Sequence, residues 1–247
     1  FNGTTGISAG YATNIPPHNL GEVIDATIYR IDNPNSRLDT LLNYVKGPDF
    51  PTGGLVMGKS GIHRAYETGK GSIVLRSRTE IETTKSGRER IVVTEFPYMV
   101  NKTKVHEHIV RLAQEERIEG ITAVRDESSR EGVRFVIEVR RDASANVILN
   151  NLFKLTQLQT NFSFNMLAIE KGVPKILSLR QILADYIAHQ QEVVVRRTQF
   201  DKDKAEARAH ILEGLLIALD HLDEVITIIR NSQTDAEAQA ELMARFE

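Results

Sequence analysis

Apolar residues follow different spacings in successive parts of the chain, and each spacing predicts a different kind of structure. Residues 1–18 are rich in glycine, threonine and proline and predict an extended segment, because proline fixes φ and disfavours helix in the residue before it. Residues 53–97 contain short apolar runs separated by glycines, which are typical of β-strands. Over 179–187 and again over 211–229 apolar residues recur every three or four positions, as on one face of a helix, and the stretch 196–210 between them is polar nearly all round.

Two short helices are predicted between the extended segment and the first strands. Asn19 and Glu22 have the spacing of a capping box, which predicts a helix from 19 to about 29. Ser36 and Asp39 repeat this spacing and predict a second helix that ends near residue 44.

Residues 88–170 alternate between strand and helix patterns in the order β-α-β-β-α-β, with a hairpin turn over 128–132. This order predicts a ferredoxin-like unit and an α+β fold class, but such a scaffold serves many functions. The expected strands are 90–96, 121–125, 133–139 and 164–169, and the expected helices are 102–116 and 143–158.

The last part of the chain predicts one long helix from Leu179 to Arg230, since it contains a single glycine and no proline after Pro174. Its later apolar residues are separated by steps of three and four, which is close to the seam of a coiled coil. A helix of this length exceeds any globular core and predicts a stalk that packs on another helix. The seam consists of Ile211, Leu215, Leu219, Leu222, Ile226 and Ile229.

The composition of the 247 residues, with 41% hydrophobic and 26% charged side chains, is that of a globular protein. The absence of cysteine excludes a disulfide framework, a thiolate zinc site and a cysteine nucleophile. No stretch approaches the ~20 apolar residues of a membrane span. The net charge is −2, yet residues 59–111 carry 11 basic and 6 acidic side chains. This surplus indicates either a phosphate-facing surface or an ordinary solvated face.

Residues 53–60 match the phosphate-loop pattern G-x-x-x-x-G-K-[ST] letter by letter. A phosphate loop requires a strand before it and a helix that begins at its Lys-Ser. Here the loop positions contain the apolar residues Leu55-Val56-Met57, and 61–64 show no helical periodicity. We therefore favour a β-hairpin turn over a nucleotide site.

Three further patterns have both a chemical and a structural interpretation. His106 and His108 are two residues apart, so a helix points them in different directions, and we expect a solvated face rather than a metal site. Asp201 and Asp203 could form a metal-binding pair, but they lie among Lys202, Lys204 and Glu206, so we expect an ion-paired surface instead. Lys102 and Lys104 begin a predicted helix, where the dipole disfavours cations, so they either contact phosphate or are merely exposed. The residues by themselves reveal no convincing active site.

Several runs of sequence occur in an order that resembles one known family. They are GTTGI at 3–7, ATNIPPHNL at 12–20, EFPY at 95–98, VNKTK at 100–104, DES at 126–128, NFSFNM at 161–166 and RAHILEGL at 208–215. The chain resembles, over nearly its whole length, the A subunit of bacterial type IIA topoisomerases, and it is more similar to the gyrase branch than to the topoisomerase IV branch.

This resemblance implies a fold and a function. The family cuts both strands of one duplex with a nucleophilic tyrosine, passes another duplex through the gap and reseals it, with ATP hydrolysis. The implied domains are an extended DNA-facing segment with linker helices over 1–52, a tower-like α+β domain over 53–174, and a coiled-coil stalk over 175–247 that reaches toward a dimer gate.

The resemblance also implies which residues contact DNA. It assigns to Ile15 the role of a wedge between base pairs, held out by two prolines, and the alternative is that Ile15 packs inward as a staple for the helix at Asn19. The neighbours in the motif, with the two lysines, complete the implied DNA-binding set: Thr13, Asn14, Ile15, Pro16, His18, Lys102 and Lys104.

The catalytic machinery is implied to lie elsewhere. In the family the nucleophile follows an arginine upstream of the ATNIPPH run, and no tyrosine here follows an arginine, so we expect this piece to be inert alone. The resemblance places no metal or cofactor in this chain, and it places Mg²⁺ and ATP in a partner B subunit. It further implies double-stranded DNA as a partner, a homodimer within an A2B2 tetramer, and a cytoplasmic, nucleoid-associated location.

Two alternatives to gyrase-like function stay open from the sequence. One is a non-enzymatic DNA-binding or coiled-coil protein that uses the same features, and the other is a phosphate-loop nucleotide hydrolase. The A subunit of topoisomerase IV is the alternative within the family.

Overall fold

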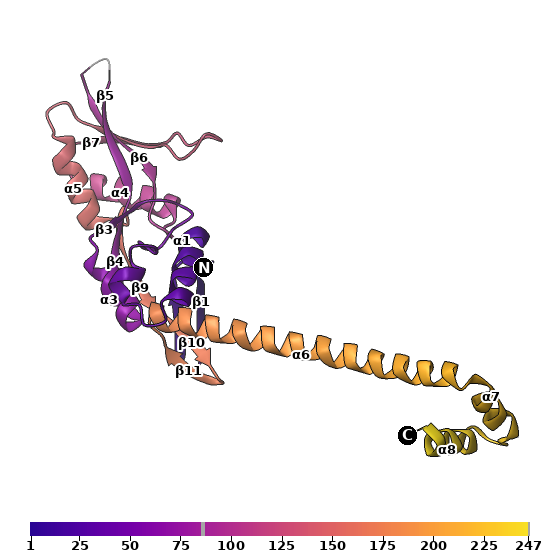
Figure 1. The fold of residues 1–247 in the computed structure, drawn as a ribbon. Coiled ribbons are helices and arrows are strands. Elements are labelled where there is room, and N and C mark those ends of the chain that lie inside the picture. Colours follow the sequence, from indigo (N-terminus) through magenta and orange to yellow (C-terminus); the bar gives the residue numbers. More distant parts are fainter. Residues whose placement is uncertain (85–86, 247) are drawn as a thin grey trace. The chain divides into compact units, whose positions relative to one another are not determined.

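The computed structural model describes residues 1–84 and 87–246, and contacts between residues divide the chain into two compact units, Phe1–Ile187 and Ala188–Glu247. The first unit contains three antiparallel sheets, of five, two and four strands (Figure 1). Two separate clusters of buried side chains fill it, one against each of the larger sheets.

The five-stranded sheet has the strand order β1-β2-β9-β4-β3 and brings residues from both ends of the first unit together. Its centre is the pair β4·β9, in which Gly71 lies opposite Phe164 and Ile73 lies opposite Phe162. The strands are β1 (Thr4–Ser8), β2 (Tyr11–Ile15), β3 (Leu55–Met57), β4 (Lys70–Arg76) and β9 (Gln159–Asn165).

Helices that precede β4 in the chain, and the long helix that follows β9, supply side chains to the core of this sheet. It combines Phe162 and Phe164 with Leu41, Tyr66 and the first apolar residues of the long C-terminal helix. A Cβ on Gly71 would lie 2.9 Å from the Cβ of Ala65, so a glycine lets helix and sheet approach closely. The covering helices are α1 (Leu20–Asp32), α2 (Leu38–Leu41) and α3 (Ser60–Thr68).

The four-stranded sheet has the order β5-β6-β8-β7, and two helices pack along it (Figure 1). Ile91, Phe135 and Ile137 of the sheet form one cluster with Ile109 and Leu152 of the helices, all fully buried. The strands are β5 (Arg78–Thr83), β6 (Glu89–Glu95), β7 (Ile121–Asp126) and β8 (Phe135–Val139), and the helices are α4 (Lys102–Gln114) and α5 (Ala145–Leu155).

The predicted ferredoxin-like unit is wrong in its fourth strand. In a ferredoxin-like unit the fourth strand, expected at 164–169, pairs with the first, which is β6 here, but β5 takes that place and β9 joins the other sheet. The reason is local. β5 and β6 form a hairpin, which closes only a short loop, whereas the phenylalanines of β9 are buried in the core of the five-stranded sheet, the cluster with Leu41 and Tyr66, which we call the second core. The mixed fold with antiparallel sheets is confirmed, with the order β-β-α-β-β-α in this part of the chain.

The smaller predictions have mixed outcomes. Asn19 caps α1 as expected, since its Oδ1 accepts from the backbone N–H of Glu22 at 3.2 Å. Ser36 does not cap α2; it is buried, and its Oγ accepts from Arg30 at 3.0 Å. The turn at 128–132 is confirmed by the bridge between Ser129 and Gly132. After Asn165, β10 (Leu167–Glu170) and β11 (Val173–Ile176) form a separate hairpin.

Residues 53–68 combine a confirmed strand with a helix that the sequence analysis missed. Leu55-Val56-Met57 forms β3 and pairs with β4, so these residues are not a phosphate-binding loop. However, α3 begins at Ser60 and connects β3 to β4, so the β-hairpin turn that we favoured is wrong and a helix lies where we expected none. Its apolar residues Ile62, Ala65 and Tyr66 have helical spacing and are buried, but Gly61 at the second position obscures the pattern.

The C-terminal residues form three helices rather than one. The predicted helix ends ten residues early, because α6 (Leu179–Asp220) stops at His221, whose φ of −121° and ψ of 38° are not helical. No proline or glycine marks this break. The following helices are α7 (Leu222–Asn231) and α8 (Asp235–Phe246). An ion pair of 2.5 Å between Arg245 of α8 and Glu224 of α7 joins these two helices.

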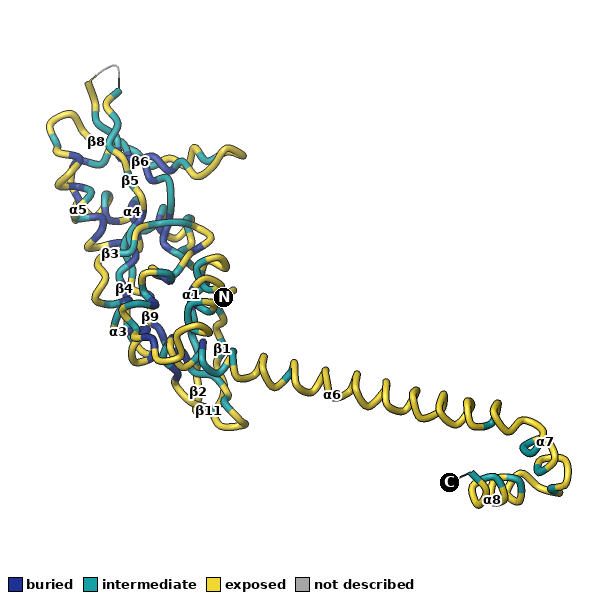
Figure 2. The backbone as a smooth tube through the Cα atoms, in the orientation of Figure 1, coloured by how far each residue is buried: buried dark blue, intermediate teal, exposed yellow. Residues whose placement is uncertain are grey.

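The second unit has little apolar surface protected from solvent (Figure 2). The six residues of the predicted seam are 39–64% exposed, so the described residues do not cover them and the coiled coil stays a prediction. Lys202 pairs with Glu206 and Gln199 with Asp203, which confirms the polar surface predicted around Asp201. Among the described helices, none is long and apolar enough to cross a membrane.

Candidate nucleic-acid interface

The ATNIPPH run forms β2 and the turn after it, and its polar side chains fasten this strand to its neighbours. Thr13 Oγ1 donates to the carbonyl oxygen of Leu167 at 2.9 Å. Asn14 Nδ2 donates to the carbonyl of Ser163 at 2.6 Å, and its Oδ1 accepts from Thr5 at 3.0 Å. Both predicted DNA-binding side chains are therefore already bonded within the protein.

Ile15 is the last residue of β2 and lies at the boundary between the sheet and the second core. Its backbone pairs with Thr4, and its half-buried side chain packs on that core. The following Pro16 is buried. A Cβ on Gly3, whose φ is +76°, would come within 2.8 Å of the Ile15 carbonyl and of Pro17, so only glycine allows the N-terminal strand to pass there.

His18 is held in a defined orientation beneath the two prolines. Its Nε2 lies 2.7 Å from the hydroxyl of Tyr66, and the ring also hydrogen-bonds the Pro16 carbonyl. Burial lowers the pKa of His18 to about 4, so the ring is neutral at pH 7. Burial raises the pKa of Tyr66, so its hydroxyl keeps its proton and can donate to Nε2 of the neutral His18 ring. His18 thus orients the turn and offers no positive charge to phosphate.

The two predicted lysines have different surroundings. Lys102 Nζ lies 2.6 Å from Asp126 Oδ2 and 3.1 Å from Ser128 Oγ. The hydrogen bond from Lys102, with that from Ser128, lowers the pKa of Asp126 to about 2. Lys104 is exposed, and in the described part of the chain it has no ion pair. Of the two, it is therefore Lys104 that has an uncompensated charge.

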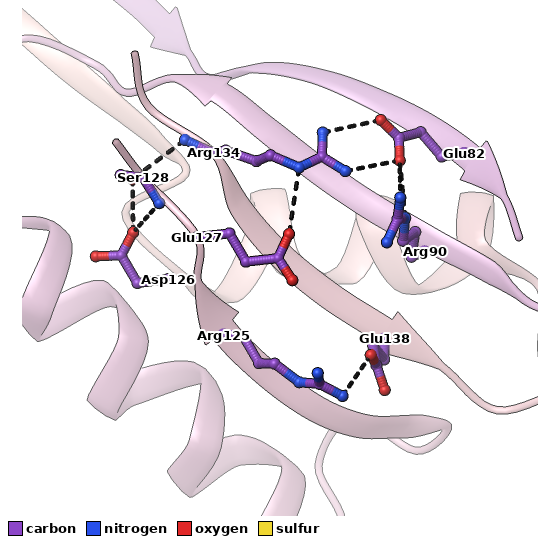
Figure 3. A network of polar contacts seen from close by, with 8 residues as sticks. All are labelled: Glu82, Arg90, Arg125, Asp126, Glu127, Ser128, Arg134 and Glu138. Carbon is purple, nitrogen blue, oxygen red and sulfur yellow. Dashed lines mark hydrogen bonds and ion pairs between the residues drawn. The ribbon is translucent and has the colours of Figure 1, made fainter. Parts of the chain in front are cut away.

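Arginines at the four-stranded sheet are paired with carboxylates (Figure 3). Arg134 makes a two-pronged contact with Glu82, at 3.0 and 2.9 Å, and Arg90 approaches the same carboxylate at 2.7 Å. The arginines, Arg134 above all, lower the pKa of Glu82 to about 2. Arg78 pairs with Glu95 at 3.1 Å. These ion pairs, which the sequence could not locate, occupy individual arginines, but Glu82 and Glu95 belong to residues 59–111 themselves, so the pairs do not reduce the charge surplus of that region.

His106 occupies a different environment from the solvated one expected. Its Nε2 lies 3.2 Å from the carbonyl of Val124, and its ring packs edge-on against Phe135 at 5.9 Å. His108 instead faces a hollow with Lys104 and Arg111. Among the described residues, no three His, Asp or Glu side chains are placed to hold a metal ion.

Sequence reasoning missed most of the residues that share a surface with Lys104. Arg111 and His108 follow it at helical spacing on α4, which is a signal that could have been read. Lys154 of α5 lines the same hollow, and no local signal connects it to α4. Only the packing of the two helices on one sheet brings these cations together.

The comparisons with known proteins agree with one another. The family model that describes the A subunit of DNA gyrase/topoisomerase IV matches residues 1–247. The DNA gyrase A subunit of Streptococcus pneumoniae serotype 4 is 81% identical over 99% of the chain, and that of Streptococcus pyogenes serotype M3 is 79% identical over all of it. The DNA gyrase A subunit of Clostridium acetobutylicum is 55% identical over 99%. The chain spans about 30% of the length of these relatives.

Proposed function

Because this chain belongs to the family of DNA gyrase and topoisomerase IV A subunits, we propose that it contributes DNA binding and bending to the breakage-reunion subunit of an ATP-dependent type IIA topoisomerase. The names of the relatives support the gyrase branch in particular. The complete enzyme, an isomerase, would supercoil DNA by passing one duplex through another.

The observation that carries this proposal is the placement of Ile15 at the end of an anchored strand. Asn14, just before it, is bonded to β9, and His18, just after the prolines, is fixed by Tyr66. A β-branched apolar side chain on such a rigid support is suited to enter between base pairs, where unstacking costs a few kcal/mol that the bent duplex recovers in contacts.

The other motif residues would act as supports rather than as direct ligands. Thr13 and Asn14 hold the strand, Pro16 stiffens the turn, and neutral His18 orients it. Lys102 and Lys104 would face the backbone of the bent flank, with Lys104 contributing the larger share because Lys102 is paired with Asp126.

The cleavage chemistry is proposed to come from outside this set of residues. None of the six tyrosines follows an arginine, and Tyr66 is fully buried. The proposed partners are double-stranded DNA, a second copy of the A subunit, with which it dimerises, and the ATPase B subunit, with which it forms an A2B2 tetramer in the bacterial cytoplasm at the nucleoid. Mg²⁺ and ATP are proposed to bind the B subunit.

The test is the bend angle of a duplex bound to the complete enzyme, measured by fluorescence transfer between its ends. Ile15→Ala is expected to abolish most of the bend and strand passage. Because Ile15 also packs on the second core, the variant is expected to lose about 1 kcal/mol of unfolding free energy, and bending is therefore measured well below its melting temperature. A wild-type bend in folded Ile15→Ala enzyme would show that Ile15 only packs inward.

The alternative functions predict other results. A non-enzymatic DNA-binding protein would not restore supercoiling when combined with the remaining parts of a gyrase. The A subunit of a topoisomerase IV would decatenate rather than supercoil. The nucleotide hydrolase is disfavoured, because β3 occupies the positions of its phosphate loop.

A further inference from the structure

The turn after Ile15 contacts the second core through a tyrosine. Residues 16–18 form this turn, and Nε2 of His18, at its end, lies 2.7 Å from the hydroxyl of Tyr66 in α3. Tyr66 is fully buried, whereas His18 is half-buried. A buried phenol hydroxyl requires a hydrogen-bond partner, and the imidazole of His18 is the partner that it has here. The turn is therefore joined to a group inside the core.

The ring of Tyr66 is held in place by its surroundings. It packs edge-on against Phe164 of β9, with 6.0 Å between the ring centroids and 86° between the ring planes. A Cβ on Gly71 would lie 2.9 Å from that of Ala65, the residue before Tyr66, so α3 lies directly against β4. Tyr66 therefore offers its hydroxyl at a fixed position, which makes it a rigid support for the turn.

Other hydrogen bonds of the turn use main-chain groups. The N–H of Asp49 donates to the carbonyl of Pro17 at 2.9 Å, and the N–H of His18 donates to the carbonyl of Phe1 at 2.7 Å. These bonds fix the course of the backbone, but neither of them reaches α3. The hydroxyl of Tyr66 therefore supplies a separate contact, which a side-chain substitution can remove while the main-chain bonds stay.

We infer that Tyr66 is a positioning residue for DNA bending, because its hydroxyl holds His18 and, through His18 and the two prolines, sets the direction in which Ile15 meets the duplex. The inference rests on the proposed function, since it takes Ile15 as the wedge. A side chain that enters between base pairs is pushed back by the stacking that it opens. That force passes to the turn behind Ile15, where the prolines fix φ. A turn joined to the core resists it, whereas a turn without this bond yields and bends fewer of the bound duplexes.

The test measures the bend of a duplex on the complete enzyme with Tyr66→Phe in its A subunit. This substitution removes the hydroxyl and keeps the buried ring. The control is Tyr44→Phe, which makes the same chemical change at another tyrosine that packs on the second core. The ring of Tyr44 packs on that of Tyr29 at 5.1 Å, and its hydroxyl hydrogen-bonds none of the described residues. Bending is measured well below the melting temperature of each variant.

Tyr66→Phe is expected to lower the ratio of bent to unbent duplex about fivefold, which is the effect of one lost hydrogen bond on an equilibrium. Tyr44→Phe is expected to keep the wild-type ratio. Wild-type bending by folded Tyr66→Phe enzyme would overturn the inference and, where Ile15→Ala has lost its bend, leave the proposed function intact. Wild-type bending by Ile15→Ala would overturn both.

A double-mutant cycle shows whether Tyr66 acts through His18. His18→Ala removes the same hydrogen bond from its other side and is expected to reduce bending at least as much. Tyr66→Phe added to His18→Ala is expected to cause no further loss, because two residues that act through one contact are not additive. His18→Gln, whose Oε1 can accept in place of Nε2, is expected to keep most of the bend. Additive losses in the double variant would show that Tyr66 acts by another route and would overturn the inference.

Discussion

The imidazole of His18 and the hydroxyl of Tyr66 form a hydrogen bond of 2.7 Å that joins the turn after β2 to helix α3. The two rings also pack at 5.6 Å between centroids. Forty-eight residues separate them in sequence. This contact fixes the turn that carries the two prolines and therefore the position of Ile15.

The His18 contact predicts a loss of stability in mild acid. The folded-state pKa of about 4 lies below the ordinary value of 6.5, so between these values the unfolded chain binds the proton that the folded chain excludes. The neutral, buried ring of His18 makes its full contribution to the unfolding free energy above pH 6.5, and this contribution is lost as the pH falls toward 4. We expect the unfolding free energy to fall by about 3 kcal/mol over this window. Denaturant titrations at several pH values measure this, and His18→Gln, which cannot titrate, should remove that part of the slope.

The ion pair of Lys102 predicts a measurable change at Asp126. Replacing Lys102 by methionine removes the first cause of the low pKa, so the pKa of Asp126 should rise from about 2 toward its ordinary value. NMR titration of the carboxyl carbon records it, with Lys104→Met as the variant that leaves Asp126 unchanged. Both partners are partly exposed, so the stability cost should stay below about 1 kcal/mol. An unaltered Asp126 titration in Lys102→Met would contradict the pairing.

Gly61 is expected to tolerate no side chain. A Cβ there would lie 2.5 Å from the carbonyl oxygen of Ser72, so α3 and β4 would have to separate. Gly61→Ala should cost about 2 kcal/mol in thermal or denaturant unfolding. Gly214→Ala is the opposite case: nothing lies within 4 Å in the middle of α6, and alanine should raise helix stability by up to about 1 kcal/mol. Equal effects at the two positions would refute this packing.

Met99 has a left-handed backbone, with φ of 64°, and a side chain that is 72% exposed. Met99→Gly removes the steric cost of this conformation and little packing, so stability should be unchanged or higher by up to about 1 kcal/mol. Met99→Val places a β-branched residue in this left-handed conformation and should lower the unfolding free energy by about 1 kcal/mol. Chemical denaturation of the two variants provides the comparison, and a more stable valine variant would exclude strain at this residue.

Local sequence determined many elements but not how they pair. Asn19 starts α1 because a cap needs only the backbone amide of Glu22, and the apolar runs of β6, β8 and α4 are readable at periods of two and 3.6. The break at His221 has no local signal, and the strand pattern of β9 could not tell which sheet it joins.

The family resemblance also came from the sequence, because short runs such as ATNIPPH keep their order along the chain. The partners of those residues came only from the tertiary structure. Antiparallel pairing of β2 with β9 engages Asn14, burial beside Tyr66 makes His18 neutral, and Asp126 compensates Lys102 but not Lys104. The reason is physical: a residue's type fixes what it can donate, accept or charge, whereas burial and distance to distant residues decide which of these it does.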